Sequence, residues 1–335
     1  MLCFCLVVFC CLLALSGCAN NGADNGADSD AATGDLTPVT LMLDWTPNTN
    51  HTGVYVAMAK GYYQDAGLEV NILQPAEGGT EMAVATGQAE FGVSFQEVLV
   101  NALASDDPLP ITAVAAMVDH NTSTLISLKE KNITSFKNLE NATYAAWGAL
   151  AELAVVKQCM EIQGGDFDTV NVVPAPGVDA IGLLQGGDVD AVWVYEAWEV
   201  PMFELAGIEC NTIRFRDVAP ELDYYTPLLI AGNAFLEENP EAAKAFLAAT
   251  AKGYQFAAEN PEEAADILCE AAPELNQELV LKSQNILSPL YQDDAPYWGY
   301  IDQARWQTFN DWFYNQGLIE KEVGAEGYTN DYLPQ

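Results

Sequence analysis

The stretch VTLMLDWTPNTNHTGVYVAMAKGYYQDAGLEVNIL, residues 39–73, contains a complete strand–helix–strand unit. Residues 39–45 are mostly apolar and predict a buried strand, and residues 52–60 predict a helix that ends at Gly61. Residues 68–73 alternate Leu, Val and Ile with polar side chains and predict a second strand. Because strand, helix and strand in this order form a right-handed parallel unit, the sequence predicts an α/β fold.

The same pattern continues and then restarts about 100 residues later. A helix after Gly79 and a strand over residues 89–95 complete the first set of elements. Residues 142–195 predict a second set in the same order, in which DVD at 188–190 aligns with QAE at 88–90. The sequence therefore predicts two similar α/β lobes.

The chain after about residue 225 is predicted to be helical. Asn-Pro pairs at 239–240 and 260–261 each place an N-cap Asn before a Pro at the first helical position. Two further sets of side chains are expected to pack in the core, a helical stripe and the cysteines beyond the N-terminal run: Trp306, Phe309, Phe313, Cys159, Cys210 and Cys269.

The composition limits the partners of this protein. Half of the 335 residues are apolar, and 48 acidic residues outnumber 12 Lys and Arg, for a formal charge of -36. Such a charge repels a phosphate backbone, so nucleic acid is not expected as a partner. The acidic excess indicates either a solvated surface or a surface for a cationic partner.

The N-terminus resembles a bacterial lipoprotein signal. Residues 1–18, MLCFCLVVFCCLLALSGC, form an apolar run without Lys or Arg before it, and they end at a small-residue site that would make Cys18 the lipidated N-terminus. The alternative is a membrane-spanning anchor, for which the run is shorter than the roughly 20 residues required. Residues 19–37 are small and acidic and are expected to form a flexible tether.

Catalytic motifs are sparse in this sequence. Ser94 in GVSFQ lacks the second Gly of a nucleophile elbow, and neither HExxH nor a Walker A pattern is present. The sequence has two histidines, His51 and His120, and no spacing typical of a metal site. We therefore expect a binding protein that is not an enzyme and that uses neither metal nor cofactor.

Aromatic and acidic residues follow matching strands in the two lobes. Asp44 and Trp45 end the first strand, and Tyr195 and Glu196 end the corresponding strand of the second lobe. Ligands collect beyond the carboxyl ends of strands in open α/β sheets. A flat, nitrogen-rich ring could stack on the aromatic rings, which contributes about 0.5 to 1.5 kcal/mol per pair, while Glu196 accepts charge-assisted hydrogen bonds.

Other residues near these strand ends leave two interpretations open. The loops at 78–80 and 147–149 each precede a helix, so their backbone N–H groups could receive a polar or anionic group. Tyr55, like Trp45, could stack on the ligand or pack in the core, whereas Trp198 is expected to pack. His51 could serve the ligand or hydrogen-bond the turn around it.

Residues 43–53, LDWTPNTNHTG, followed by Tyr-Val-Ala at 55–57, resemble the opening motif of the thiamine-precursor-binding proteins. The resemblance extends to AKGYY at 59–63, GQAEFG at 87–92 and VYE at 194–196, and covers nearly all of residues 38–330. The first motif is specific to that group of proteins. The others recur in many solute-binding proteins.

This resemblance implies a type II periplasmic-binding-protein fold, in which two α/β lobes enclose a cleft. Residues 38–130 and 223–335 would form lobe 1, and residues 131–222 would form lobe 2. The implied function is that of a substrate-binding lipoprotein on the outer face of the cytoplasmic membrane, which delivers formylaminopyrimidine or hydroxymethylpyrimidine to an ABC permease. The implied ligand-binding residues, of which Glu97 and Trp147 are assigned by position, are Asp44, Trp45, Asn48, His51, Tyr55, Glu97, Trp147, Tyr195 and Glu196.

Two alternatives come with the same resemblance. The family includes fungal pyrimidine synthases, which use a lysine-bound pyridoxal phosphate, a sacrificed histidine and a cysteine-rich iron motif. In this sequence Ser94 stands near the lysine position, residues 94–101 contain no histidine, and YYTPLL at 224–229 replaces the cysteines. A related branch binds riboflavin and has a similar opening motif.

Overall fold

A computed structural model describes residues 36–75, 79–149, 151–175, 177 and 179–334. The predicted lipoprotein signal over residues 1–18, its Cys18 and nearly all of the tether over residues 19–37 lie outside the described residues.

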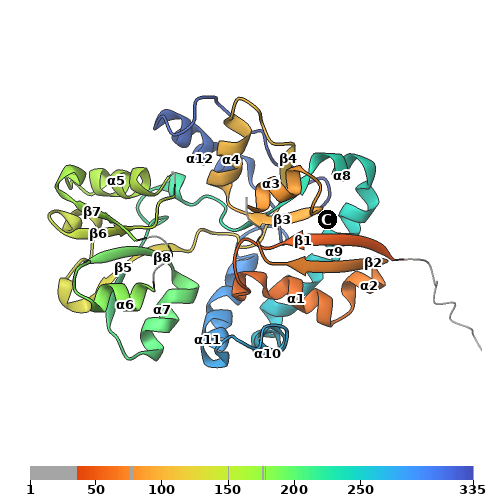
Figure 1. Ribbon diagram of the computed structural model, residues 1–335, viewed down its shortest axis with the longest axis horizontal. Helices are drawn as coiled ribbons and strands as arrows, with labels where there is room; N and C mark the ends of the chain where they lie inside the picture. The colour runs from red at the N-terminus through yellow and green to blue at the C-terminus, as the bar shows by residue number, and fades with distance from the viewer. Residues whose placement is uncertain (1–35, 76–78, 150, 176, 178, 335) are drawn as a thin grey trace, which may run out of the picture. The chain divides into compact units, whose positions relative to one another are not determined.

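The described residues form two five-stranded sheets with the same strand order (Figure 1). The first sheet has the order β2-β1-β3-β10-β4 and consists of β1 (Thr37–Met42), β2 (Leu68–Leu73), β3 (Phe91–Ser94), β4 (Ile111–Ala116) and β10 (Leu228–Gly232). The second has the order β7-β6-β8-β5-β9 and consists of β5 (Ser123–Leu128), β6 (Thr143–Ala146), β7 (Asn171–Pro174), β8 (Ala191–Tyr195) and β9 (Cys210–Arg214).

Each sheet combines a parallel core with one reversed strand. In the first sheet β1 pairs in parallel with β2 and β3, and β10 is antiparallel to both β3 and β4. In the second sheet β6 pairs in parallel with β7 and β8, and β5 is antiparallel to β8 and β9. The two predicted α/β lobes are therefore confirmed.

Helices connect and cover these strands. The α-helices are α1 (Thr52–Ala59), α2 (Tyr62–Asp65), α3 (Thr80–Ala85), α4 (Gln96–Ala104), α5 (Glu152–Ile162), α6 (Ala180–Gln185), α7 (Glu196–Leu205), α8 (Asn233–Glu238), α9 (Pro240–Glu259), α10 (Pro261–Ala271), α11 (Gln277–Leu287) and α12 (Gln303–Asn315). Short 3-10 helices are η1 (Thr49–His51), η2 (Lys129–Lys131), η3 (Phe136–Leu139), η4 (Phe167–Thr169), η5 (Pro220–Leu222) and η6 (Ser288–Tyr291).

Both faces of each sheet are covered, as expected for strands that are apolar on both sides. Figure 1 shows α3, α4 and α12 on one side of the first sheet and α1 and α9 on the other. Met42 packs in the cluster of α3 and α4, whereas its neighbour Leu41 packs in the cluster of α1 and α9. In the second sheet Tyr144 packs toward α5 and Ala145 toward α6 and α7.

The chain passes between the sheets twice. The first crossover, residues 117–122, joins β4 to β5, and the second, residues 215–227, joins β9 to β10. The first boundary between the lobes was expected at residue 130. It lies earlier in the structure, because β5 ends before residue 130 and pairs with β8 and β9 of the second sheet. β10 also differs from the expectation of a helical region after about residue 225, because these five residues form a fully buried strand.

Predictions for the later helices were correct in position but not in every contact. Asn239 and Asn260 are the N-cap residues of α9 and α10, each followed by Pro, but neither side chain makes the capping hydrogen bond. Each Asn also ends the preceding helix, and the Asn260 amide donates backward to the carbonyl of Phe256 at 3.1 Å.

The residues expected to serve packing do so. Trp306, Phe309 and Phe313 are fully buried on α12, Cys159 is buried, and Cys210 and Cys269 are partly buried and unpaired. Within the described residues, no helix combines the length and the apolar character needed to cross a membrane.

Candidate functional site

The turn after β1 is held by a network centred on His51. His51 is fully buried, and its Nδ1 accepts the backbone N–H of Asn48 at 3.2 Å. This contact assigns the proton to Nε2, which donates to Asp44 Oδ1 at 2.7 Å. Asn48 caps η1 by accepting the N–H of Asn50 at 2.9 Å. His51 therefore shapes the turn, as one of the two interpretations of the sequence predicted, and orients Asp44.

Side chains of helices α9 and α11 and of the short helix η6 form hydrogen bonds with this turn. Tyr254 and Tyr291 donate hydrogen bonds, each of 2.6 Å, to the backbone carbonyls of Asn50 and Thr49. These contacts leave Trp45 at the exposed end of the turn, with 63% of its surface accessible. An indole this exposed stabilises no core, so it is free to stack on a ligand.

Tyr55 is partly buried in a hydrophobic cluster. It packs beside Trp198 against Ala265 and Leu268 of α10 and Val280 of α11. Core packing was one of the two interpretations of Tyr55, and it is the expected role of Trp198.

Glu97, in the first turn of α4, has a buried carboxyl group with one oxygen that lacks a hydrogen-bond partner. It is 5% exposed, and its Oε2 atom makes no hydrogen bond within the described part of the chain. Burial, with a contribution from the charge of Glu81, raises the pKa of Glu97 to about 7. Glu81 itself accepts a hydrogen bond from the buried Ser94 hydroxyl. A buried polar atom without a partner is rare and is typical of a site that a ligand completes.

Tyr195, the last residue of β8, connects the two sheets at this site. Burial raises the pKa of Tyr195, and the charges of Glu97 and Asp44 raise it further, so its hydroxyl lies close to both carboxylates. Thr226 of the second crossover is a neighbour of the same hydroxyl. Asp44 and Glu97 of one lobe thus lie near Tyr195 of the other. Their role in ligand binding stays a prediction.

Glu196 is committed to a protein partner. Arg214 of β9 donates from Nε to Oε2 and from Nη2 to Oε1, both at 2.7 Å, which is the bidentate geometry of a strong ion pair. The predicted ligand role of Glu196 stays a prediction, and it would require a ligand that competes with this guanidinium. One turn further along α7, Glu199 accepts the N–H of Tyr195 at 3.0 Å, and burial raises its pKa to about 7.

The backbone N–H groups of the loop before α5 have a different partner from the one predicted. Trp147 is 36% exposed and meets Trp193 edge to face at 6.3 Å. The backbone N–H groups of Trp147 and Gly148 were expected to be available to a ligand, but both donate to the Glu152 carboxylate at 3.1 and 2.7 Å. That expectation was wrong because an acid in the first turn of the helix folds back onto the loop. The other predicted loop begins at residue 78, which lies outside the described residues.

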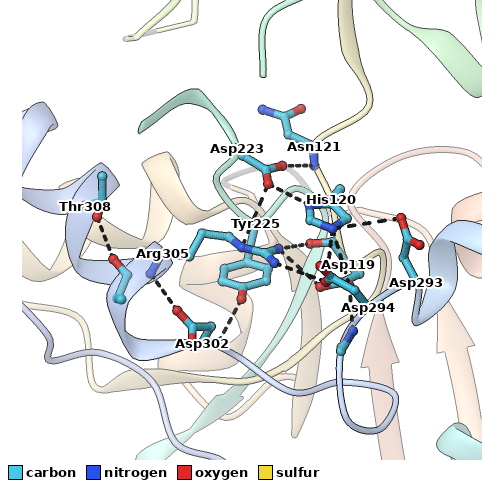
Figure 2. Close-up of polar contacts among 12 residues, drawn as sticks. Asp119, His120, Asn121, Asp223, Tyr225, Asp293, Asp294, Asp302, Arg305 and Thr308 are labelled. Carbon is cyan, nitrogen blue, oxygen red and sulfur yellow. Dashed lines mark hydrogen bonds and ion pairs between the residues drawn. The ribbon is translucent and has the colours of Figure 1, made fainter. Parts of the chain in front are cut away.

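A second polar cluster joins the two crossovers (Figure 2). His120 Nδ1 lies 2.6 Å from Asp223 Oδ2, and Asn121 donates its N–H to Asp223 Oδ1 at 2.9 Å. Arg305 of α12 completes the cluster with Nη1 at 3.2 Å from Asp119 Oδ1. The cluster ties both connecting segments to the C-terminal helix.

This cluster already contains a positively charged side chain among its carboxylates. Asp119, His120 and Asp294 offer ligand atoms within 4.8 Å of one another. Arg305, however, already lies among these carboxylates, as Figure 2 shows, and supplies a positive charge there.

Several residues of the site were missed by reasoning from the sequence. Glu81, Glu152, Glu199 and Thr226 carry no recognisable motif. Glu152 and Glu199 had one available signal, since each is an acid in the first turn of a helix that follows a strand end.

Comparison with known proteins shows what this arrangement resembles. A formylaminopyrimidine-binding protein from Halalkalibacterium halodurans is 30% identical over 322 residues, which cover 94% of each chain. A 4-amino-5-hydroxymethyl-2-methylpyrimidine phosphate synthase from Legionella pneumophila is 30% identical over 88% of this chain and 92% of its own. The riboflavin-binding protein RibY from Chloroflexus aurantiacus is 23% identical over 93% of this chain and 90% of its own.

Solved structures show the same fold at low sequence identity. The periplasmic aliphatic sulphonate binding protein SsuA from Escherichia coli has a TM-score of 0.67 and 14% identity, covering 85% of this chain and 94% of its own. The periplasmic nitrate-binding protein NrtA from Synechocystis PCC 6803 has a TM-score of 0.67 and 15% identity, covering 89% of this chain and 87% of its own.

The chain has the two-lobed periplasmic-binding-protein fold, in which each lobe is built on one mixed sheet. Within this class the NMT1/THI5-like family model matches residues 48–264, more than half of the chain. The chain belongs to the NMT1/THI5-like family.

Proposed function

We propose that this protein is the substrate-binding component of an ABC importer and that it binds a thiamine pyrimidine precursor, formylaminopyrimidine or hydroxymethylpyrimidine. The buried Oε2 atom of Glu97, which has no hydrogen-bond partner within the described residues and lies near Tyr195, is the observation that carries the proposal. The name of the Halalkalibacterium relative supports the choice of ligand.

An aminopyrimidine has the chemistry that this site lacks. A carboxyl group with a pKa near 7 can be protonated or ionised at neutral pH. In either state it can form two hydrogen bonds, one with an amino group and one with the adjacent ring nitrogen. A protonated carboxyl group donates to the neutral ring nitrogen, and an ionised carboxylate accepts from the protonated ring nitrogen. Exposed Trp45 provides a face on which the flat ring can stack.

We further propose that the protein is not a synthase, although some relatives carry that name. An amine is needed to hold pyridoxal phosphate as an imine. Ser94 is fully buried, has a hydroxyl in place of an amine, and donates it to Glu81. A riboflavin receptor is the second candidate, because Trp45 and Trp147 present two exposed indoles and RibY is a relative over most of its length.

A thermal unfolding series tests the ligand. The protein is heated with formylaminopyrimidine, hydroxymethylpyrimidine, thiamine, riboflavin or pyridoxal phosphate. A ligand at 100 times its Kd adds about 2.7 kcal/mol and raises the Tm visibly. A shift with a pyrimidine supports the proposal, a shift with riboflavin alone changes the cargo, and a shift with pyridoxal phosphate alone contradicts it.

Replacing Trp45 with Ala tests the stacking face. We expect the Kd for the pyrimidine to rise more than tenfold, about 1.4 kcal/mol, with little change in the Tm of the free protein because Trp45 is exposed. Tyr314→Ala is a matched control, since Tyr314 is an exposed aromatic residue on α12. Calorimetry measures both variants, and an unchanged Kd for Trp45→Ala would remove Trp45 from the site.

Replacing Glu196 with Ala tests the other carboxylate. A rise in the Kd of more than tenfold would mean that the ligand displaces Arg214. An unchanged Kd would leave Glu196 as a structural partner of Arg214.

The proposed location is the outer face of the cytoplasmic membrane, through a lipid on Cys18. Metabolic labelling with a radioactive fatty acid tests this directly. We expect label in the wild type and none in Cys18→Ala, and label that persists in the variant would contradict the assignment.

A further inference from the structure

The proposed site is lined by acidic side chains. Asp44, Glu81, Glu97 and Glu199 lie on the elements that form it, and none of them pairs with Lys or Arg among the described residues. The Arg214 guanidinium is already held by both oxygens of Glu196. An anion that enters this site therefore meets repulsion without a compensating partner.

Glu152 takes up the backbone N–H groups of the loop before α5. The loop after β6 leads into α5, an 11-residue helix, and the backbone N–H groups before a helix N-terminus favour negative charge. Glu152 is 1% exposed, and its carboxylate accepts Trp147 N–H at 3.1 Å, Gly148 N–H at 2.7 Å and Tyr144 O–H at 2.7 Å. The chain has thus filled this position with its own anion.

This loop is part of the ligand site because of the strand that precedes it. β6 lies beside β8 in parallel, so Trp147 and Tyr195 follow the same edge of the sheet. The contact between Trp147 and Trp193 of β8 confirms that the two strand ends are adjacent. A substituent that reaches from Tyr195 toward Trp147 would approach the Glu152 carboxylate.

We propose that the site is closed to anions, that it accepts a neutral or protonated heterocycle and rejects the phosphate ester of the same heterocycle, and that Glu152 determines this selectivity. The inference rests on the proposed function for its choice of heterocycle. It gives the chain a charge preference opposite to that of the sulphonate- and nitrate-binding proteins that share its fold.

Paired ligands test the selectivity in the wild-type protein. Calorimetry compares hydroxymethylpyrimidine with its phosphate ester, and riboflavin with its phosphate ester, at fixed ionic strength. For whichever pair binds, we expect the ester to bind at least about 100-fold more weakly, equivalent to about 2.7 kcal/mol. An ester that binds within threefold of its alcohol overturns the proposal.

A panel of simple anions separates this proposal from the proposed function. Sulfate, inorganic phosphate and ethanesulfonate are each titrated and followed by thermal unfolding at constant ionic strength. We expect no shift specific to any of them, and saturable binding of one of them would overturn the proposal. If neither heterocycle binds, the proposed function fails, and the anion panel alone decides the charge selectivity.

Glu152→Gln tests the residue assigned to the selectivity. The amide removes the charge but keeps an oxygen that can accept from the loop, so we expect the affinity for the ester to rise at least tenfold. The affinity for the alcohol should change less than threefold. Because the ratio of the two affinities is measured within one variant, a general loss of stability does not produce this result.

Glu161→Gln is the matched control. Glu161 lies at the other end of α5, has 55% of its side chain exposed, and pairs loosely with Lys157 at 3.8 Å. Removing its charge should leave the ratio unchanged. Equal ratios in wild type and Glu152→Gln would overturn the role of Glu152, and the wild-type ligand pairs would still decide whether the site excludes anions.

Discussion

The buried carboxyl group of Glu97 lowers the stability of the folded protein when it is ionised. Folding raises its pKa from 4.5 to about 7, chiefly by burial, so the folded protein holds this proton more tightly than the unfolded chain does. The free energy of unfolding therefore falls as pH rises from about 4.5 to 7, and the loss is complete above pH 7. A carboxyl group kept in this state is useful only if a ligand satisfies it.

Glu97→Gln should stabilise the free protein while it weakens ligand binding. We expect the Tm and the free energy of unfolding to rise at pH 8, by about 1 to 3 kcal/mol, and to change little at pH 5. Urea unfolding of both proteins at the two pH values measures this. The exposed acid in Glu322→Gln is the control, and an equal effect of Glu97→Gln at both pH values would show that the carboxyl charge is not the cause.

A comparison of Asp44 with Glu196 shows how far the site could be predicted from the sequence. Asp44 and Tyr195 were predicted because each lies at the end of an apolar strand, and strand ends are where such sheets bind ligands. Glu196 met the same criterion, yet Arg214 lies two strands away in the sheet order and neutralises it. Sequence spacing does not reveal such a partner, since pairing across a sheet depends on register.

At the scale of elements, the contact between α1 and α9 positions the turn after β1. A Cβ atom placed on Gly253 would lie 1.9 Å from the carbonyl oxygen of Gly53, and one placed on Gly53 would meet the ring of Tyr254 at 2.3 Å. The two helices therefore touch through glycine backbone. This close approach allows Tyr254 to reach the carbonyl of Asn50 in the turn.

Gly253→Ala should destabilise the protein even though Ala is the better helix former. The helix preference of about 1 kcal/mol favours Ala, but the clash with a backbone atom forces the helices apart and costs about 3 kcal/mol. Denaturant unfolding should show the loss, and ligand affinity should fall with it because the turn moves. Lys252→Ala, at the exposed neighbouring position, should stay within about 0.5 kcal/mol of wild type.

The elements themselves were predictable where their pattern is local. The periodicity of residues 68–73 located β2, and the Asn-Pro pairs located the starts of α9 and α10. β10 was missed because it is a short apolar run inside a helical region, and such a run does not distinguish a strand from a helix. Its place between β3 and β4 depends on the second crossover, which no local pattern encodes.

The pairing of the two crossovers makes a pH-dependent contribution to stability. The hydrogen bond to Asp223 is the main cause that raises the pKa of His120 above 6.5, while Arg305 opposes it and Asp119 adds to it. Asp293 and Asp294 also face the ring, at 3.9 and 3.3 Å from Nε2. Because the folded state binds the proton more tightly, this stabilisation is complete below pH 6.5 and is lost as pH rises through the raised pKa.

His120→Gln should therefore reduce stability more at pH 5.5 than at pH 9. We expect a difference of about 1 kcal/mol at the lower pH, which shrinks as wild-type His120 loses its proton. Urea midpoints of wild type and variant across this range provide the measurement. A difference that stays constant with pH would indicate lost packing in place of a lost charge interaction.

At the scale of the whole molecule, both lobes contribute residues to the proposed site, and two crossovers connect the lobes. Asp44 and Glu97 belong to the first sheet and its helices, whereas Tyr195 and Glu152 belong to the second. A ligand that contacts both sets favours the arrangement in which they are close. His120 and Asp223 lie on the two crossovers, and Arg305 of α12 links them (Figure 2).

The charge of the whole chain opposes its compact state. With 48 acidic residues against 12 basic ones, self-repulsion should destabilise the folded protein at neutral pH. Raising NaCl from 10 to 150 mM shortens the Debye length from about 30 to 8 Å, so most of this repulsion is screened.

We expect the free energy of unfolding to increase by about 1 kcal/mol and the Tm by roughly 2 °C, and the gain to level off at higher salt. The same titration near the sequence pI of 4.1 is the control, because the net charge vanishes there and the gain should vanish with it. An equal gain at both pH values would show that salt acts through a specific ion effect, and the acidic surface would then carry no stability cost.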